Sequence, residues 1–348
     1  MAEPSPFELS RCRLPCLHGI EDALHRIRPF LSETPLVRSE LLSRLFVADV
    51  WTKNDTVSPI ACFKLRGALT ELLRAQTCSS ISAAVTSSTG NHGQGVAYAA
   101  RLLGIPAHIF LPVGANPTKR LTIQALGGTV HEAGNDIDAA KAMARAFTAT
   151  HGHCFVDDGE SLEVMEGAGT VGLEVAQTLK AIDWLIVPMG SGSLASGCGA
   201  ALKALQPEAR ILAVQAKGSP AMVESFFARR AIARPVQTVA DGLVCREPAT
   251  RALAALWKFV DDALLVSDEE LLVAVHALAA LAHVLVEPSG AAAFAAAWQR
   301  RADLKGKRIV FVLTGANITS EVLQRAVTTA LPFSVDTVLQ EEARSYED

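Results

Sequence analysis

The amino-acid sequence predicts an α/β protein in which mostly parallel β-sheets are covered by helices. Short apolar runs alternate with longer amphipathic stretches along the chain, and this alternation is typical of strand–helix–strand units. Glycine-rich loops follow several of the apolar runs, at the strand ends where parallel α/β folds bind their ligands. Of the 348 residues, 50% are hydrophobic. The chain can therefore build a large core, and we expect two lobes rather than a disordered protein.

The expected elements follow in chain order. Short apolar runs predict strands at 46–51, 83–87, 107–112, 154–158, 183–189, 210–216, 263–268 and 308–315. Apolar residues at helical spacing predict helices at 94–104, 117–127, 137–152, 268–286 and 288–301. These patterns leave the order of the strands within each sheet open.

Charge and composition indicate a soluble protein with a small-molecule partner. The net charge is −4, and lysines and arginines are scattered, which gives no basic surface for nucleic acid or an anionic membrane. No segment has the roughly 18 apolar residues of a membrane span, and the first residues carry charges and prolines where a signal peptide needs an apolar core. The seven cysteines form no C-x-x-C pair, so we expect reduced thiols and a cytoplasmic location.

The first candidate binding loop is SSTGNHGQG at 87–95, between a predicted strand and a predicted helix. Its glycines allow backbone N–H groups to converge on an anion at the helix N-terminus. Asn91 and His92 add directional side chains. These features favour a carboxylate or phosphate site, and a simple glycine-rich turn is the alternative.

A second loop, MGSGSLASG at 189–197, also joins a strand to a helix. GSGSLA fits the G-x-G-x-x-A pattern of dinucleotide-binding loops, which makes an NAD-dependent oxidoreductase an alternative. That alternative requires an acidic residue at the end of the next strand, where this chain has Gln215. A phosphate monoester needs only N–H groups and hydroxyls such as those of Ser191 and Ser193.

Two further polar residues lie close to predicted strand or helix ends. Thr314, in LTGAN at 313–317, could present its hydroxyl to a ring nitrogen or cap a helix that starts near Ile318. Glu287, which precedes Pro288, either approaches the same ligand or stabilises the first turn of a helix.

Lys64 lies in the stretch ACFKLRGA, between Phe63 and Leu65. A lysine with apolar neighbours either extends its ammonium group to water or loses its charge, because burial of an unpaired charge is costly. A lysine that loses its charge, a phosphate loop and an anion-binding loop together indicate pyridoxal phosphate, whose aldehyde forms an imine with a lysine. The alternative from another class is a ligand-binding protein without catalytic activity, in which Lys64 forms no imine.

Several motifs resemble those of the serine/threonine dehydratase (threonine ammonia-lyase-like) group of fold-type II pyridoxal-phosphate enzymes. CFKLRGA is similar to the lysine motif of that group, SSTGNHGQGVAYA to its S-x-G-N-H-x-Q-G-x-A segment, and GSGSL to its phosphate loop. EPSGAAA (287–293), TGAN and PTKRLTIQALGGTV match further motifs, and the resemblance spans residues 20 to 330.

The resemblance implies a two-lobed fold like that of the tryptophan synthase β subunit. A small domain of residues 60–155 would be inserted into a large cofactor-binding domain of residues 1–59 and 156–348. The resemblance also implies a homodimer, and because few residues follow the last motif we expect no regulatory domain.

The resemblance further implies roles for individual residues. Lys64 is expected to hold the cofactor as a Schiff base and to move the α-proton of the substrate, with Phe63 beside the ring. Thr314 would face the pyridine nitrogen, and Asn91 would bind the ring 3-hydroxyl. The expected phosphate-binding residues are Gly190, Ser191, Gly192, Ser193 and Leu194. The expected residues around the substrate carboxylate are Ser88, Thr89, Gly90, Asn91 and His92.

The implied reaction is β-elimination from a β-hydroxy amino acid such as L-threonine or L-serine, which yields a 2-oxo acid and ammonia. One alternative is a larger substrate, such as 3-hydroxyaspartate, phenylserine or a hydroxyectoine-derived compound. Another is an amino-acid racemase, because Thr89 lies where related racemases have a serine. Relatives that bind a divalent cation have an acidic residue in place of Gln215, so no metal site is expected.

Overall fold

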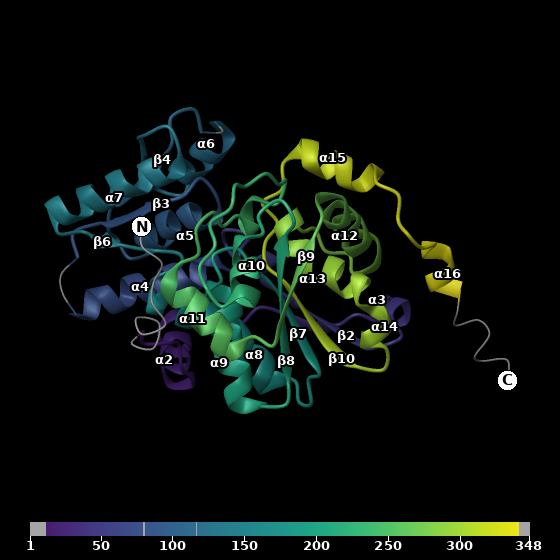
Figure 1. Cartoon of the computed structure of the whole chain (residues 1–348). Coiled ribbons are helices and arrows are strands. Elements are labelled where there is room, and N and C mark those ends of the chain that lie inside the picture. The colour runs from purple at the N-terminus through teal and green to yellow at the C-terminus, as the bar shows by residue number, and fades with distance from the viewer. Residues whose placement is uncertain (1–11, 79–80, 116, 341–348) are drawn as a thin grey trace.

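The structure, a computed structural model, describes residues 12–78, 81–115 and 117–340 and contains two β-sheets (Figure 1). The larger sheet has six strands, in the order β1 (Leu36–Arg38), β2 (Asp49–Asn54), β10 (Arg308–Leu313), β7 (Trp184–Pro188), β8 (Arg210–Ala216) and β9 (Asp262–Val266). The smaller sheet has four strands, in the order β5 (Gly128–Glu132), β4 (Ala107–Leu111), β3 (Ala84–Ser87) and β6 (Cys154–Phe155). Neighbouring strands are parallel except for β1, which pairs antiparallel with β2. The predicted fold class is therefore confirmed.

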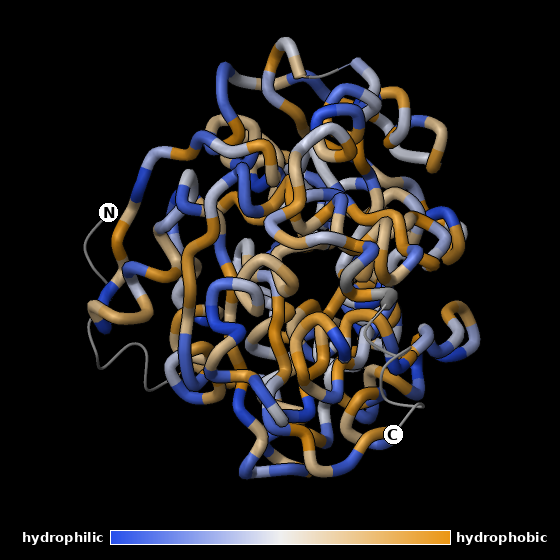
Figure 2. Tube along the Cα trace, turned by 90° about the vertical axis from the view of Figure 1, so that its right-hand side faces the viewer, coloured by the Kyte–Doolittle hydropathy of each residue, from blue (hydrophilic) through white to orange (hydrophobic). Residues whose placement is uncertain are grey.

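Helices enclose the smaller sheet on both faces. Helix α5 (Asn91–Leu102) contacts three of its strands and also meets α4 (Lys64–Cys78) and α6 (Pro117–Ala125), whereas α7 (Ile137–His151) covers the opposite face. Successive side chains of a strand point to opposite faces, so Ile109 packs on the α5 side and Phe110 on the α7 side. Figure 2 shows the alternation of hydrophobic and hydrophilic segments along the trace that produces these layers.

The larger sheet is also covered on both faces. Helices α8 (Leu162–Thr178) and α9 (Ser193–Leu205) pack on the face that receives Val187, and α13 (Pro288–Gln299), with α12 (Asp268–Leu281) against it, packs on the face that receives Ile186. The remaining helices are α2 (Leu17–Ile27), α3 (Glu40–Phe46), α10 (Ala221–Ala228), α11 (Thr250–Phe259), α14 (Arg301–Leu304), α15 (Ser320–Thr328) and α16 (Val335–Gln340), with the 3-10 helices η1 (Asp55–Val57) and η2 (Asp241–Leu243).

The structure differs from the sequence-based expectation at several element ends. β2 begins at Asp49 rather than at residue 46, because Phe46 ends α3 and Val47 adopts a left-handed φ of 49° that terminates the helix. Two strands were not predicted. β1 is short and mostly exposed, so it has no alternating pattern, and β5 follows α6 directly after a turn at Gly127, where φ is 102°.

The four strands of the smaller sheet all lie between residues 84 and 155, inside the range expected for the small domain. Helix α4 starts at Lys64 and contacts both α5 and α8. The domain boundaries at residues 60 and 155 therefore stay a prediction.

A network of buried charges joins β2, α4 and α8. Arg66, Asp55 and Lys53 are fully buried, and Glu174 is 1% exposed. Arg66 donates to Asp55 Oδ2 at 2.7 Å and to Glu174 Oε2 at 2.9 Å, and Lys53 Nζ lies 2.7 Å from Glu174 Oε2. Burial raises the pKa of the Glu174 carboxyl, but Arg66 and Lys53 outweigh this effect and hold that pKa below its ordinary value. Glu174 therefore stays anionic inside the core, next to Arg66 and Lys53.

A cluster of four histidines surrounds Phe147 on the α7 side of the smaller sheet. The ring centroids of His108, His131, His151 and His153 lie 5.1, 5.7, 4.3 and 5.3 Å from that of Phe147. His108 Nδ1 and His131 Nε2 share a hydrogen bond of 3.0 Å. Burial lowers the pKa of His108, His131 and His153, and neighbouring imidazoles add to the effect at His108 and His153.

We expect Glu174→Gln to lower the free energy of unfolding by about 3–5 kcal/mol, because Arg66 and Lys53 would then be buried opposite a single carboxylate. Urea unfolding measures the loss. Glu132→Gln is the matched control, since Glu132 pairs with Arg120 on the surface, where such a change costs about 1 kcal/mol or less. Equal losses of unfolding free energy in the two variants would show that Glu174 does not stabilise the fold by balancing the buried cations.

The histidine cluster predicts a loss of stability in mild acid. Below a pH of about 6.5, the ordinary pKa of histidine, the unfolded chain takes up protons that the folded cluster resists. The contribution of the cluster to the free energy of unfolding is complete above that pH. It decreases as the pH falls toward the lowered pKa values of these histidines in the folded protein. Between about pH 7 and pH 5, the thermal midpoint of His108→Gln/His153→Gln should therefore fall less than that of the wild type.

His25→Gln is the control for this experiment, because His25 is exposed on α2. It should keep the wild-type dependence of the thermal midpoint on pH. A double variant that also keeps this dependence would show that the cluster does not couple protonation to unfolding.

Candidate active site

A cavity of about 210 Å³ lies where loops of the two sheets meet. Its lining residues include those that follow the carboxyl ends of β3, β6, β7 and β10, the position at which parallel α/β sheets bind ligands. All residues with an expected site role line this cavity: Phe63, Lys64, Ser88, Thr89, Gly90, Asn91, His92, Gly190, Ser191, Gly192, Ser193, Leu194 and Thr314. Their individual roles remain predictions, but the fold brings them together.

The segment before Lys64 is tied to the loop after β10. Phe63 N donates to Thr314 O at 3.0 Å, and Ala316 N donates to Ala61 O at 2.9 Å. Ala61 adopts a left-handed φ of 51°, which costs a residue with a Cβ about 1 kcal/mol. The turn places Lys64 at the first position of α4, with its side chain directed into the cavity.

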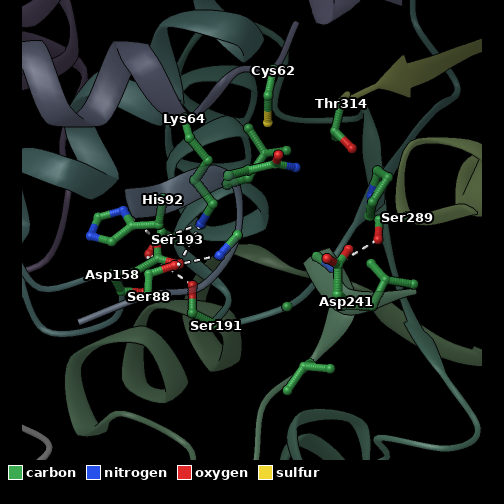
Figure 3. A pocket seen from close by; sticks show the side chains of 18 of the residues that line it. Cys62, Lys64, Ser88, His92, Asp158, Ser191, Ser193, Asp241, Ser289 and Thr314 are labelled. Carbon is green, nitrogen blue, oxygen red and sulfur yellow. Dashed lines mark hydrogen bonds and ion pairs between the residues drawn. The ribbon is translucent and has the colours of Figure 1, made fainter. Parts of the chain in front are cut away.

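Lys64 is mostly buried, and its ammonium group is paired. Its side chain is 12% exposed, and Nζ donates to both carboxylate oxygens of Asp158 at 2.5 Å (Figure 3). Asp158 also faces His92, whose Nδ1 lies 3.9 Å from Oδ1 of the aspartate. A carboxylate thus balances the lysine charge, an arrangement that the sequence-based argument did not consider.

The loop after β7 forms an anion site at the start of α9. Gly192 is the N-cap, with a φ of 95° and no side-chain capping bond, so the first N–H groups of the helix are left for a ligand. A Cβ on Gly190 would lie 2.4 Å from Gly242 O, and one on Gly192 would lie 2.8 Å from Met222 Cε. Both positions therefore require glycine.

The loop after β3 presents a second set of donors. Gly90 is the N-cap of α5, again without a side-chain capping bond. Gly93 approaches Ser88 so closely that a Cβ would lie 2.5 Å from the Ser88 carbonyl oxygen. Within the described part of the chain, Ser87 Oγ is buried without a hydrogen-bond partner, as expected of a polar group that binds a ligand.

Asn91 is held from two sides. Its Nδ2 donates to Glu287 Oε1 at 2.7 Å, and its Oδ1 accepts from Asn317 Nδ2 at 2.7 Å. One N–H of Asn91 Nδ2 remains for a ring hydroxyl. Glu287 lines the cavity and is the N-cap of α13, but its side chain makes no capping bond. Its approach to a ligand stays a prediction. Burial and the charge of Asp241 raise the pKa of Glu287 to about 7.

Thr314 lies in the cavity wall and is 4% exposed. The helix that was expected near Ile318 is α15, which begins at Ser320 and has Thr319 as its N-cap, with the Thr319 side chain accepting from Val322 N. The capping alternative for Thr314 is therefore wrong. Its hydroxyl is available to a ligand in the cavity, as Figure 3 shows.

Asp158 and Asp241 are site residues that sequence reasoning missed. Asp158 follows β6, so the rule for the carboxyl ends of parallel strands would have found it. Asp241 begins η2, in a loop that no strand pattern marks, and its carboxylate pairs with Lys119 of α6.

Within the described ranges, no group of three or more His, Cys, Asp or Glu side chains could hold a metal ion. Gln215 instead accepts hydrogen bonds from the N–H groups of Met222 and Val223 at 3.1 and 3.2 Å, at the start of α10.

Among the helices that the structure describes, none has the length and apolar character needed to cross a membrane.

The donor set fits pyridoxal phosphate. The glycine cradle at Gly190 and Gly192 leaves room and N–H groups for a phosphate. Lys64 supplies an amine within the same cavity, Thr314 supplies a neutral hydroxyl, and the unpaired Ser87 hydroxyl adds a polar contact. An adenine dinucleotide would need an acidic ribose ligand, and Gln215 is occupied at α10.

Comparison with known proteins agrees with this interpretation. The family model for pyridoxal-phosphate-dependent enzymes matches residues 27–315. An L-threonine ammonia-lyase of Thermotoga maritima is 32% identical over 318 residues, which cover 90% of this chain and 79% of that protein. A serine racemase of Schizosaccharomyces pombe is 31% identical over a stretch that covers 88% of this chain and 96% of that protein. The crystal structure of a threonine deaminase from T.th. is similar over 88% of this chain and 99% of that chain, with a TM-score of 0.82 and 31% identity. The chain belongs to the family of pyridoxal-phosphate-dependent enzymes and has the fold of type II.

Proposed function

We propose that the protein is an ammonia-lyase that converts a β-hydroxy amino acid, such as L-threonine or L-serine, into a 2-oxo acid and ammonia. The observation that carries the proposal is the convergence of Lys64, the loop at 87–92 and the loop at 190–194 in one cavity. A threonine ammonia-lyase and a threonine deaminase among the similar proteins support it. The homodimer implied by the family resemblance and the cytoplasmic location expected from the cysteine pattern are part of the same proposal.

Each part of the cavity has a task in this reaction. Bound pyridoxal phosphate supplies an aldehyde that condenses with amines and a ring that accepts the electron pair left by a departing α-proton. The N–H groups at 190–194 hold the phosphate, and Ser88, Thr89 and the N-terminus of α5 hold the substrate carboxylate. Lys64 Nζ takes the α-proton, because Lys64 supplies the side-chain amine among the described residues that line the cavity.

The hydroxyl of Thr314 has a specific consequence for the elimination. A neutral hydroxyl accepts or donates a hydrogen bond but does not hold a proton on the pyridine nitrogen as a carboxylate would. Less negative charge is then drawn away from the α-carbon, which favours departure of the β-hydroxyl. This role for Thr314 belongs to the proposal.

The charges of the lining favour a substrate with a neutral β-substituent. Asp158, Asp241 and Glu287 all line the cavity, and the described lining contains no arginine. A β-carboxylate would find no unpaired cation among the described lining residues, because Lys64 pairs with Asp158, and Lys119 nearby pairs with Asp241. It would also add an anion near the cofactor phosphate, and like charges repel each other. L-Threonine and L-serine avoid this repulsion, whereas 3-hydroxyaspartate does not.

Racemisation is a second candidate activity. The hydroxyl of Thr89 lines the same cavity as Lys64, from a different element, and two acid–base groups in one site can exchange an α-proton between its faces. The similar serine racemase supports this candidate. Chiral chromatography of L-serine incubated with the enzyme would detect the D-enantiomer.

We expect Lys64→Ala to lose visible absorbance of the bound cofactor and to form 2-oxo acid from L-threonine on the order of 10³-fold more slowly, since both attachment and proton transfer need the amine. The spectrum and a 2-oxo acid assay measure the two losses. Lys180→Ala is the matched control, because Lys180 is exposed after α8 and donates to Ala176 O. Wild-type protein that shows no such absorbance when supplied with pyridoxal phosphate would refute the proposed function.

We expect kcat/KM for L-threo-3-hydroxyaspartate to be at least about 100-fold below the better of the values for L-threonine and L-serine, because of the carboxylates in the lining. Initial rates of 2-oxo acid formation over a range of substrate concentrations give the ratio. A higher value for 3-hydroxyaspartate would leave the lyase activity in place and assign it to a dicarboxylic substrate.

A further inference from the structure

Asp158 is the residue in contact with Lys64 that no sequence motif identified. Its backbone carbonyl accepts a hydrogen bond from Ser193 Oγ at 3.1 Å, which ties it to the loop at 190–194. Its side chain is 28% exposed and turns into the cavity, where both oxygens lie 2.5 Å from Lys64 Nζ (Figure 3). The carboxylate therefore faces the nitrogen atom that attaches the cofactor and moves the α-proton.

Among the groups around Asp158, Lys64 is the one whose charge pairs directly with its carboxylate. The other titratable groups that influence it are His92 on α5, Lys141 on α7 and Cys245 in the loop after η2. Lys141 is engaged by Asp157, whose carboxylate is 3.1 Å away. Lys64 is thus the cation that touches Asp158.

His92 is neutral in this arrangement. Burial lowers its pKa, and the nearby charge of Asp158 only partly offsets that effect. Its Nε2 bonds to Val156 O at 3.1 Å, which assigns the proton to Nε2 and leaves Nδ1 without a partner among the described residues. A neutral imidazole does not compensate the charge of Asp158.

Asp158 itself is anionic. Burial raises the pKa of its carboxyl, but the charge and hydrogen bonds of Lys64 lower it, and the pKa lies below its ordinary value. Near neutral pH the cavity therefore holds a fixed negative charge within hydrogen-bond distance of the lysine nitrogen.

We propose that Asp158 is a positioning residue that holds the amine of Lys64 and stabilises the positive charge that this amine gains when it takes the α-proton. In that step the Cα–H bond breaks, an N–H bond forms on Lys64 Nζ, and the electron pair stays with the substrate and cofactor. The amine is neutral before the transfer and an ammonium group afterwards. A carboxylate beside it stabilises the second state more than the first, which lowers the barrier. This inference rests on the proposed role of Lys64.

The same contact makes a prediction for cofactor attachment. An ammonium group does not attack an aldehyde, so a proton must leave the ion pair of Lys64 with Asp158 before the cofactor attaches. Asp158→Asn keeps the shape of the side chain and removes its charge. Because this variant lacks the ion pair, we expect the pH at which half of the protein attaches pyridoxal phosphate to be lower than in the wild type. Visible absorbance, with borohydride trapping and mass measurement, gives this pH.

The effect on proton transfer is measured with L-alanine, which has an α-proton but no leaving group. Proton NMR in D₂O follows the exchange of that α-proton by the loaded enzyme. On the high-pH plateau, Asp158→Asn should exchange it on the order of 10²-fold more slowly, with L-alanine saturating the enzyme at a similar concentration. Asp158→Glu, which keeps the charge, should restore part of the rate.

Asp157→Asn is the matched control. Asp157 is the adjacent residue, carries the same charge and pairs with Lys141 and Arg145 of α7 instead of Lys64. It should keep the wild-type pH of attachment and the wild-type exchange rate. Circular dichroism and thermal midpoints establish that all three variants are folded.

The outcomes separate this inference from the proposed function. If Asp158→Asn attaches the cofactor at the wild-type pH, or exchanges the proton of L-alanine at the wild-type rate, the role of Asp158 is refuted while the enzyme remains a lyase. If the wild-type protein itself neither attaches the cofactor nor forms a 2-oxo acid, the proposed function fails, and this inference fails with it.

Discussion

The buried pairing of Arg66 with Asp55 and Glu174 determines where the active lysine lies. Arg66 is two residues beyond Lys64 on α4, and its guanidinium reaches η1 after β2 on one side and α8 on the other. Sliding or turning α4 would separate these buried charges, which costs several kcal/mol. Because α4 also packs against α5, the network fixes the amine of Lys64 relative to the loops of both sheets.

The parts of this structure that could be predicted from sequence are those with a local signature. A strand followed by a glycine-rich turn and a helix is recognisable over one short stretch, and the loops at 87–95 and 189–197 both adopt that form around the cavity. Lys64 was recognisable for the same reason. Its apolar neighbours in the sequence argued against a fully exposed position on the surface.

What could not be predicted depends on contacts between distant residues. A charged residue is expected to be exposed unless its partner is known, and Arg66 is 108 residues from Glu174 while Lys64 is 94 residues from Asp158. Lys53 is fully buried in β2, which helps to explain why the pattern placed that strand too early. The direction of the Asn91 side chain likewise depends on Glu287 and Asn317, far along the chain.

The position of β10 has a consequence for how the enzyme is made. β10 covers residues 308–313, yet it lies inside the larger sheet, between β2 and β7. Because a ribosome makes the N-terminal parts of a chain first, the gap between β2 and β7 stays open until nearly all of the described chain has been synthesised. Thr314 and the backbone partners of the segment around Lys64 arrive with that last strand. A growing chain therefore exposes its lysine before it can enclose a reactive aldehyde, and the cavity is complete only after β10 has been synthesised and has entered the sheet.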